Sequence, residues 1–358
     1  MRVWRTLMLV LPAIVVVVVA LVVPGRASAQ AVDCGSILGP GGTYVLDRDL
    51  TCPETPPPSP DREDRIGAIK LIDGATLDLN GHTVTCSSPT ILLNGAPSTT
   101  PTYGIVVRDS TLRNGTVHDC GHGLVASGSV VKHVVFDGNV TGVYLHEKYG
   151  SGNNMIIGNT VRNNRVGFFV QESRGEHLID NLAENNQYGF MVNWRGGILV
   201  GNKAVGNDTG FWIDTGQALI GNRAIRNRVG FYIASATEMF GNIAKNNTED
   251  GFFFQTSLKT LDEARHNFAH RNGQDGFRLD VTGGAEPDGT LKKNYALANR
   301  GVGIHVLSEG DFPSAPRKKV KRNISLDNLG GDMADDGNCQ WTNWVNNTFE
   351  TAAQSCID

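Results

Sequence analysis

The sequence predicts a right-handed parallel β-helix, an all-β solenoid of stacked coils. Three observations predict this fold: a repeat of little more than 20 residues runs through the chain, asparagine returns at two fixed positions of each repeat, and a Gly-aromatic step follows the second asparagine. The short strands of one coil then pair with their counterparts in the next coil, about 4.8 Å away. Identical residues of successive coils therefore stack in columns.

The asparagine columns are the most regular part of the repeat. The second asparagine follows the first by five residues, and successive first positions lie 20 to 29 residues apart. A stacked Asn amide bonds both the local turn and the amide of the next coil. The first column is Asn159, Asn181, Asn202, Asn222, Asn242, Asn267, Asn294 and Asn323. The second is Asn164, Asn186, Asn207, Asn227, Asn247, Asn272, Asn299 and Asn328.

The positions around these asparagines predict the inside of the coil. A column of mostly small residues, such as Ala204, separates the two asparagines. The glycine before the aromatic residue is expected either where a side chain would clash or where φ must be positive. The following residues, such as Phe211 with Ile213, alternate with period two and are expected to point inward. A leucine-rich horseshoe would need a Leu-x-x-Leu-x-Leu frame, which this chain lacks.

The N-terminus has the features of a signal peptide. An apolar run over Leu7–Val23 follows two arginines, and Ala27-Ser28-Ala29 provides a cleavage site, with a cut after Ala31 fitting almost as well. The alternative is an uncleaved anchor, although the run falls short of the ~20 residues that a spanning helix needs. The expected divisions are a signal peptide at 1–29, an N-terminal cap at 30–70 around Tyr44, the β-helix at 71–330 and a disulfide-closed C-terminal cap at 331–358.

Cysteine use and charge narrow the compartment and the partners. Six cysteines in an exported chain predict disulfides and a secreted or periplasmic protein. Neighbours in sequence suggest the pairs Cys34–Cys52, Cys86–Cys120 and Cys339–Cys356, although spacing does not determine connectivity. Scattered histidines and the lack of a CxxC motif give no sign of a metal site. A net charge of −4 without a long basic run argues against nucleic acid, while a local basic patch would still allow an anionic polysaccharide.

These features resemble the right-handed β-helix repeat proteins of the pectin-lyase-like superfamily. The resemblance covers roughly Leu71–Asn328 and depends on the asparagine columns, the Gly-aromatic steps and the segment Leu77–His82. The tail from Cys339 to Ile357 resembles the ending of many bacterial members. The superfamily includes polysaccharide lyases, hydrolases, mannuronan epimerases, β-helix proteins of copper maturation and subfamilies of unknown role. The resemblance therefore implies the fold and leaves the activity open.

Signatures of the characterised enzymes are missing from the repeat. The one Asp-Asp pair, Asp335-Asp336, is expected in the tail beyond the last coil, and no Asp-Pro-His occurs. No aspartate cluster resembles the calcium site of pectate lyases. We therefore expect no cofactor, with calcium entering only if the chain is a lyase.

Strand alternation predicts an outward stripe of large side chains beside a column of mostly polar ones. Aromatic rings suit the CH faces of sugars, and polar groups suit their hydroxyls. The alternative is that a long loop or the tail covers the aromatic residues. The residues expected to bind carbohydrate are Tyr144, Phe169, Trp212, Tyr232 and Phe253, with Gln171, Asn193 and Asp214 supplying hydrogen bonds.

A reactive group is expected at the N-terminal end of this stripe. A tyrosine or histidine could take the proton alpha to a uronate carboxylate while an arginine or lysine neutralises that carboxylate. The candidates are His146, Lys148, Tyr149, Glu172 and Arg195. The alternative is an exposed loop with ion pairs. A weaker candidate combines Arg278 and Asp280 with His270 and His305, where Arg278 and Asp280 alternatively pair with each other.

Two classes of function follow from these residues. The first is an exported protein that binds extracellular or envelope polysaccharide through the stripe. The second is a polysaccharide lyase or C5-epimerase acting on a polyuronate. In both classes the partner is a polysaccharide, with no nucleic acid and no membrane once the signal peptide is removed. The sequence names neither the glycan nor the oligomeric state.

Overall fold

The computed structural model describes most of the chain after the first 30 residues. It describes residues 31–53, 67–87, 103–146, 152–193, 197–214, 216–234, 237–255, 263–282, 289–309, 318–337, 339–340 and 342–358. The predicted signal peptide lies outside these residues. Within them, no helix is long and apolar enough to cross a membrane.

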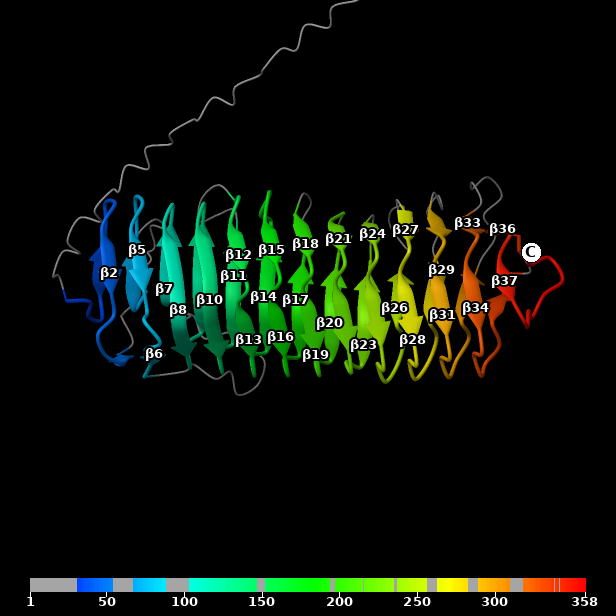
Figure 1. Cartoon of the computed structure of the whole chain (residues 1–358), viewed down its shortest axis with the longest axis horizontal. Helices are drawn as coiled ribbons and strands as arrows, with labels where there is room; N and C mark the ends of the chain where they lie inside the picture. The colour runs from blue at the N-terminus through cyan, green and yellow to red at the C-terminus, as the bar shows by residue number, and fades with distance from the viewer. Residues whose placement is uncertain are drawn as a thin grey trace, which may run out of the picture.

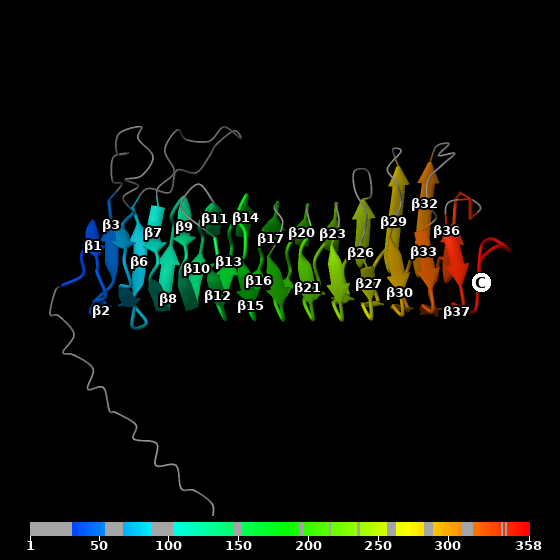
Figure 2. The same cartoon turned by 90° about the horizontal axis from the view of Figure 1, so that it is seen from above.

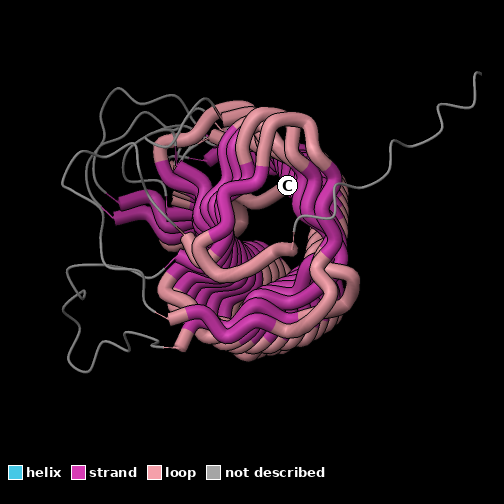
Figure 3. Tube along the Cα trace, turned by 90° about the vertical axis from the view of Figure 1, so that its left-hand side faces the viewer, coloured by secondary structure: helices cyan, strands magenta, loops and turns pink. Residues whose placement is uncertain are grey.

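The described chain winds into a right-handed parallel β-helix, as the sequence predicts (Figures 1 and 2). Viewed along the axis, the strands stack on three sides (Figure 3). We call these sides face 1, face 2 and face 3, in the order in which each coil visits them. Each strand pairs in parallel with its counterparts in the neighbouring coils, so a residue of one coil stands directly above its equivalent in the next.

The strands of each face follow one another along the axis. Face 1 consists of β1 (Ser36–Leu38), β4 (Ile69–Leu71), β7 (Tyr103–Arg108), β9 (His122–Ser127), β11 (Thr141–His146), β14 (Val166–Gln171), β17 (Tyr188–Val192), β20 (Thr209–Ile213), β23 (Val229–Ile233), β26 (Phe252–Gln255), β29 (Phe277–Thr282), β32 (Ile304–Glu309) and β35 (Met333–Asp335). Face 2 consists of β2 (Thr43–Val45), β5 (Thr76–Asp78), β12 (Met155–Ile157), β15 (His177–Ile179), β18 (Ile198–Val200), β21 (Ala218–Ile220), β24 (Glu238–Phe240), β27 (Glu263–Arg265), β30 (Thr290–Lys292), β33 (Lys318–Lys321) and β36 (Thr342–Val345). Face 3 consists of β3 (Leu50–Cys52), β6 (Thr83–Cys86), β13 (Thr160–Arg162), β16 (Leu182–Glu184), β19 (Lys203–Val205), β22 (Arg223–Ile225), β25 (Ile243–Lys245), β28 (Phe268–His270), β31 (Tyr295–Leu297), β34 (Ile324–Leu326) and β37 (Thr348–Phe349). The longer strands β8 (Thr111–His118) and β10 (Val130–Asp137) continue through faces 2 and 3.

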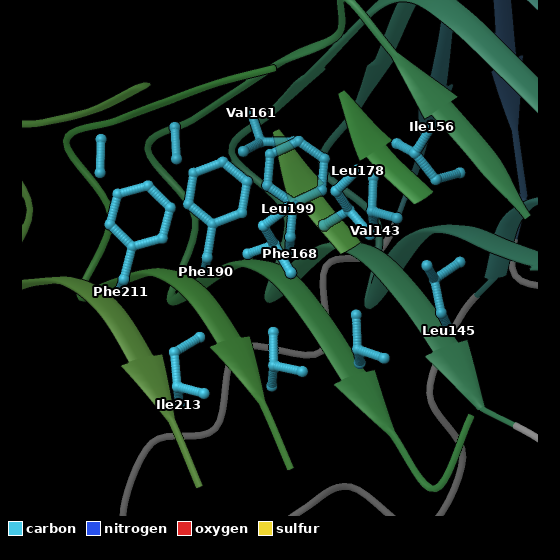
Figure 4. Packing of buried hydrophobic residues seen from close by; sticks show 14 of the residues in the cluster. Val143, Leu145, Ile156, Val161, Phe168, Leu178, Phe190, Leu199, Phe211 and Ile213 are labelled. Carbon is cyan, nitrogen blue, oxygen red and sulfur yellow. The ribbon is translucent and has the colours of Figure 1, made fainter. Parts of the chain in front are cut away.

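The interior is a set of apolar columns. The phenylalanines after the repeat glycines stack with ring centroids 4.7 Å apart and nearly parallel planes, as for Phe190 on Phe211. Figure 4 shows this column, with Leu178 and Leu199 among the residues packed with it. Each ring is fully buried, so the column removes a large apolar area from water in every coil.

The two asparagine columns form buried ladders at two of the three corners, as predicted. The first ladder lies between faces 2 and 3, and the second lies between face 3 and the next face 1 strand. In the second ladder, Asn207 Nδ2 donates to Asn227 Oδ1 at 3.0 Å and to the carbonyl of Ala183 at 3.1 Å. Its own Oδ1 accepts from the backbone N–H of Asn186 at 2.9 Å. Each amide thus satisfies backbone groups that the turn would otherwise leave unpaired.

The repeat glycine is required by crowding and not by backbone torsion. A Cβ on Gly210 would lie 2.6 Å from the carbonyl oxygen of Gly230 and 3.3 Å from Cβ of Ala204. Its φ lies outside the left-handed region. The sequence left both reasons open, and the structure supports the first.

The solenoid extends beyond the boundaries expected from the sequence. β1 to β3 already pair with β4 to β6, so the segment 30–70 contributes a coil where only a cap was expected. At the other end, β35 to β37 pair with β32 to β34, so the segment 331–358 contains a further coil. Asp335 therefore lies on face 1, and the expectation that Asp335-Asp336 falls beyond the last coil is wrong.

Three disulfides lie towards the two ends. They join Cys34 to Cys52, Cys86 to Cys120 and Cys339 to Cys356, which are the pairs suggested by neighbours in sequence. Such bonds persist in an oxidising compartment, as expected for a secreted or periplasmic protein.

Candidate functional site

The outward side of face 1 carries the predicted stripe as one column. Strand register places each member above the next, and the column continues into Arg278 and His305. The pairing of the strands sets the order of the column. The alternation of side chains along each strand directs the residue two positions after the repeat glycine away from the core. The column consists of Tyr144, Phe169, Met191, Trp212, Tyr232 and Phe253.

At the N-terminal end of the stripe, neighbouring side chains cover the aromatic ring of Tyr144. Tyr144 is only 9 % exposed, and it lies in a small cluster with Val106 and Val125. Its ring stacks on His122 at 4.7 Å and on Phe169 at 5.4 Å, with interplanar angles of 19° and 23°. Both ring faces are covered, so the sequence-based assignment of Tyr144 to a sugar-binding surface does not agree with its surroundings.

The stripe opens over Trp212, Tyr232 and Phe253, which we call the aromatic platform. All three side chains are half-buried. The Trp212 and Tyr232 rings are tilted by 44° with centroids 4.9 Å apart, and the Tyr232 and Phe253 rings meet at 68° and 5.2 Å. These rings meet tilted or edge to face, in contrast to the stacked rings around Tyr144, and the guanidinium of Arg278 lies over the Phe253 ring at 5.2 Å.

Polar side chains flank the platform on the side where the chain leaves face 1. The backbone N–H of Asp214 continues the sheet by donating to the carbonyl of Val192, and its side chain is exposed. The hydroxyl of Tyr232 donates to Oε1 of Gln255. Burial, followed by the negative charges of Asp214 and Asp280, raises the pKa of the Tyr232 phenol. The negative charges of two carboxylates therefore influence the Tyr232 phenol in the middle of the platform.

Further towards the N-terminus, Gln171 and Asn193 occupy the same polar column and are half-buried. Gln171 Oε1 accepts a hydrogen bond from the Tyr144 hydroxyl at 3.0 Å, so its acceptor is engaged within the protein.

The structure brings together part of the predicted reactive group. His146 Nε2 lies 3.8 Å from a carboxylate oxygen of Glu172, and the histidine side chain is only 12 % exposed. Lys148, Tyr149 and Arg195 lie outside the described residues. Their part in a reactive site therefore stays a prediction.

A cluster that the sequence indicated only weakly lies at the C-terminal end of the stripe. His305 Nδ1 is 2.8 Å from Asp275 Oδ2, and its Nε2 is 3.3 Å from Asp336 Oδ2. Asp275 Oδ1 accepts the backbone N–H of Val302 at 2.7 Å, and Asp275 donates its own N–H to Asp250 Oδ1 at 3.0 Å. These contacts link side chains of four successive coils beside an open cleft of about 370 Å³.

One member of the predicted second candidate lies apart from the others. Arg278 and Asp280 both lie on β29 of face 1, and Arg278 forms an ion pair with Asp250 at 3.9 Å. His270 lies on β28 of face 3, away from the stripe on face 1.

Burial controls the protonation of this cluster. It raises the pKa of Asp250 to about 6, and the nearby charge of Asp275 adds to the rise. For His305, burial opposes the charged form. The hydrogen bonds and charges of Asp275 and Asp336 outweigh it, so the pKa of the imidazole is raised.

Glu176 is one of several buried acids that the sequence did not indicate. Glu176 is 1 % exposed at the third corner, where Ser173 Oγ donates to its Oε1 at 2.5 Å and Asn154 Nδ2 donates at 3.0 Å. Burial raises the pKa of Glu176. Its neighbours along this corner, Gly197, Gln217 and Thr237, differ in type, so no repeating residue marked the column.

The fold and the stripe define a parallel β-helix protein with one aromatic outward face. The model of the family described as Periplasmic copper-binding protein (NosD) matches residues 79–240. No curated protein matches the chain in sequence.

Several solved structures are similar over most of the chain. The periplasmic alginate epimerase AlgG has 13 % identity and a TM-score of 0.42, covering 90 % of this chain and 79 % of that one. The GH87 α-1,3-glucanase from Streptomyces thermodiastaticus has 12 % identity and a TM-score of 0.46, covering 88 % and 65 %.

The donor set does not fit a copper ion in the described part of the chain. Copper sites in proteins use thiolate, thioether and imidazole ligands. Among the described residues, no three His, Cys, Asp or Glu side chains are grouped to hold a metal, and all six cysteines form disulfides.

Proposed function

We propose that this protein binds an extracellular or envelope polysaccharide through the aromatic platform of face 1. The observation that carries the proposal is the row of three half-buried, mutually tilted rings on consecutive coils, with carboxylate and amide groups beside them. Aromatic rings next to convergent polar groups are the usual elements of a sugar site.

The spacing of the rings supports an extended chain lying along the axis. The platform rings repeat at 4.9 and 5.2 Å. A glycan aligned with the solenoid would present successive sugar units to successive coils, because an extended hexose unit advances by a similar distance.

The packing of the inward columns does not explain these outward aromatic residues. Phe211 and Phe231 already fill the core side of the same strands, and they are fully buried. Partly exposed aromatic surface on one face is typical of an interaction site.

Trp212→Ala tests the proposal in a titration against a panel of soluble glycans. We expect affinity for the bound glycan to fall by roughly 0.5–1.5 kcal/mol beyond the loss of contact area. Phe240→Ala is the matched control, because Phe240 is an aromatic residue on face 2 that is 46 % exposed. Equal affinities of the parent and Trp212→Ala, with both folded, would contradict the proposal.

A further inference from the structure

The charges on face 1 bear on which glycan the platform selects. In the described part of this face from β20 to β29, Asp214 and Asp280 are the acids on the outward side, while Asp250 and Asp275, just before β26 and β29, are buried and in contact with Arg278 and His305. Two of these acids, Asp214 and Asp280, act on the phenol of Tyr232 in the middle of the platform. A polyuronate lying here would bring its own carboxylates towards like charges, which costs free energy at short range.

The corner beside the platform does not reverse this balance. Arg228 donates to Asp208 and to Glu249, each at 2.6 Å. One cation therefore faces two acids there, and the corner adds no positive charge.

The protein's own chain shows how this face holds a cation. The guanidinium carbon of Arg278 lies 5.2 Å from the centroid of the Phe253 ring. The same group is 3.9 Å from Asp250 Oδ2. A ring face and a carboxylate thus share one cation, which is a cation–π arrangement supported by an ion pair.

The preceding coils offer rings and a carboxylate in another arrangement. Trp212 and Tyr232 supply the rings, and Asp214 supplies an exposed carboxylate directly after β20, whereas Asp250 lies just before β26. Within the part of the chain that the structure describes, no cationic side chain pairs with Asp214. A ligand cation that contacts both the Asp214 carboxylate and a ring face would have the same two kinds of contact that Arg278 has at Phe253.

We infer that the platform selects a polysaccharide that contains amino sugars with free, protonated amines, and that Asp214 binds the ammonium group beside Trp212 and Tyr232. This inference depends on the proposed function, because it names the glycan class bound by the same surface. Asp280, on the opposite side of Tyr232, adds to the negative potential that favours the ammonium group.

The test compares three hexasaccharides by calorimetric titration at low salt and about pH 6, where a sugar amine is largely protonated. The probes are the β-1,4-linked glucosamine hexamer, the N-acetylglucosamine hexamer and the galacturonate hexamer. We expect the glucosamine hexamer to bind most tightly and the galacturonate hexamer least tightly. Added salt should weaken the binding of the glucosamine hexamer, because its attraction is electrostatic.

Asp214→Asn separates charge from shape. The substitution should lower the affinity for the glucosamine hexamer about five-fold. The affinity for the N-acetylated hexamer should stay nearly unchanged, because only the glucosamine hexamer has ammonium groups. Asp180→Asn, which removes an exposed carboxylate at the corner between faces 2 and 3, should change neither affinity.

The outcomes distinguish this inference from the proposed function. The amino-sugar inference is wrong if the galacturonate hexamer binds most tightly. It is also wrong if Asp214→Asn lowers the affinity for the glucosamine and N-acetylglucosamine hexamers equally. If Trp212→Ala then still weakens the bound hexamer, the proposed function stands. If Trp212→Ala has no effect on any bound hexamer, the platform itself is not the binding surface.

Discussion

Asn207 illustrates how a single residue type supports a corner of every coil. Its side chain bonds the carbonyl of Ala183 in the preceding coil and Asn227 in the next. It is 3 % exposed, so water cannot replace these bonds. Stacked asparagine could be predicted from the sequence because both the amide chemistry and the spacing repeat.

Replacing Asn207 by leucine is expected to destabilise the protein strongly. The substitution leaves at least two buried backbone groups unpaired, each costing about 1–3 kcal/mol. Chemical denaturation should show this loss, while Asn343→Leu, an exposed change on β36, should have little effect. Equal midpoints for the two variants would contradict the role assigned to the ladder.

Asp250 is expected to make stability depend on pH. Its folded pKa of about 6 lies above the ordinary value of 3.8, so between these values the folded chain keeps a proton that the unfolded chain has lost. Its contribution is fully present below about pH 4 and is lost as the pH rises through about 6. His305, with a raised pKa, acts in the same direction at higher pH.

Asp250→Asn tests this dependence because asparagine resembles the protonated acid. Near pH 4 the variant and the parent should have the same free energy of unfolding. At pH 8 the free energy of unfolding of the variant should be higher by an amount on the order of 1–3 kcal/mol. Thermal melting across this range measures the difference. A variant less stable than the parent at pH 8 would show that the charged form of Asp250 is the stabilising one.

At the scale of the element, each strand depends mainly on the strands directly above and below it. β36 and β37 pair with a neighbouring strand on one side only, and on its outer side β35 has only an isolated bridge between Met333 and Ala352. The Cys339–Cys356 disulfide spans 17 residues of this last coil. In a solenoid, stability is nearly a sum over neighbouring units, so an end coil is the first to fray.

Replacing Cys339 and Cys356 by serine should therefore loosen the end before the middle. A loop of this length contributes about 3 kcal/mol in the chain-entropy account. Hydrogen exchange should accelerate at β35 to β37 and stay nearly unchanged at β14 to β20. Uniform acceleration along the whole solenoid would show that the coils unfold as a single unit.

The ends also show where prediction from sequence stops. The coil of β1 to β3 has no Asn-x-small-x-x-Asn line, so its sequence predicts a cap although its strands pair as a coil. The last coil repeats only one ladder position, Asn347, which accepts the backbone N–H of Asn323 at 2.9 Å. Strands that pair through backbone atoms need no recurring side chain, so these coils left no clear pattern.

At the scale of the whole molecule, the direction of each side chain could be predicted but its packing could not. Strand alternation placed Tyr144 and Trp212 in one outward column, and the register confirms that placement. It did not reveal that His122 and Phe169 cover Tyr144, whereas the rings beyond Trp212 tilt apart. Ring tilt depends on neighbouring side chains in three dimensions, which period and spacing do not encode.

Hydroxyl-radical footprinting with and without a bound glycan tests the central claim most directly. We expect the glycan to protect Trp212, Tyr232 and Phe253 on face 1 and to leave Phe240 on face 2 as reactive as in the free protein. Protection of Phe240 and its exposed neighbour Ile220, with Trp212 still reactive in the complex, would place the binding surface on face 2 and contradict the account.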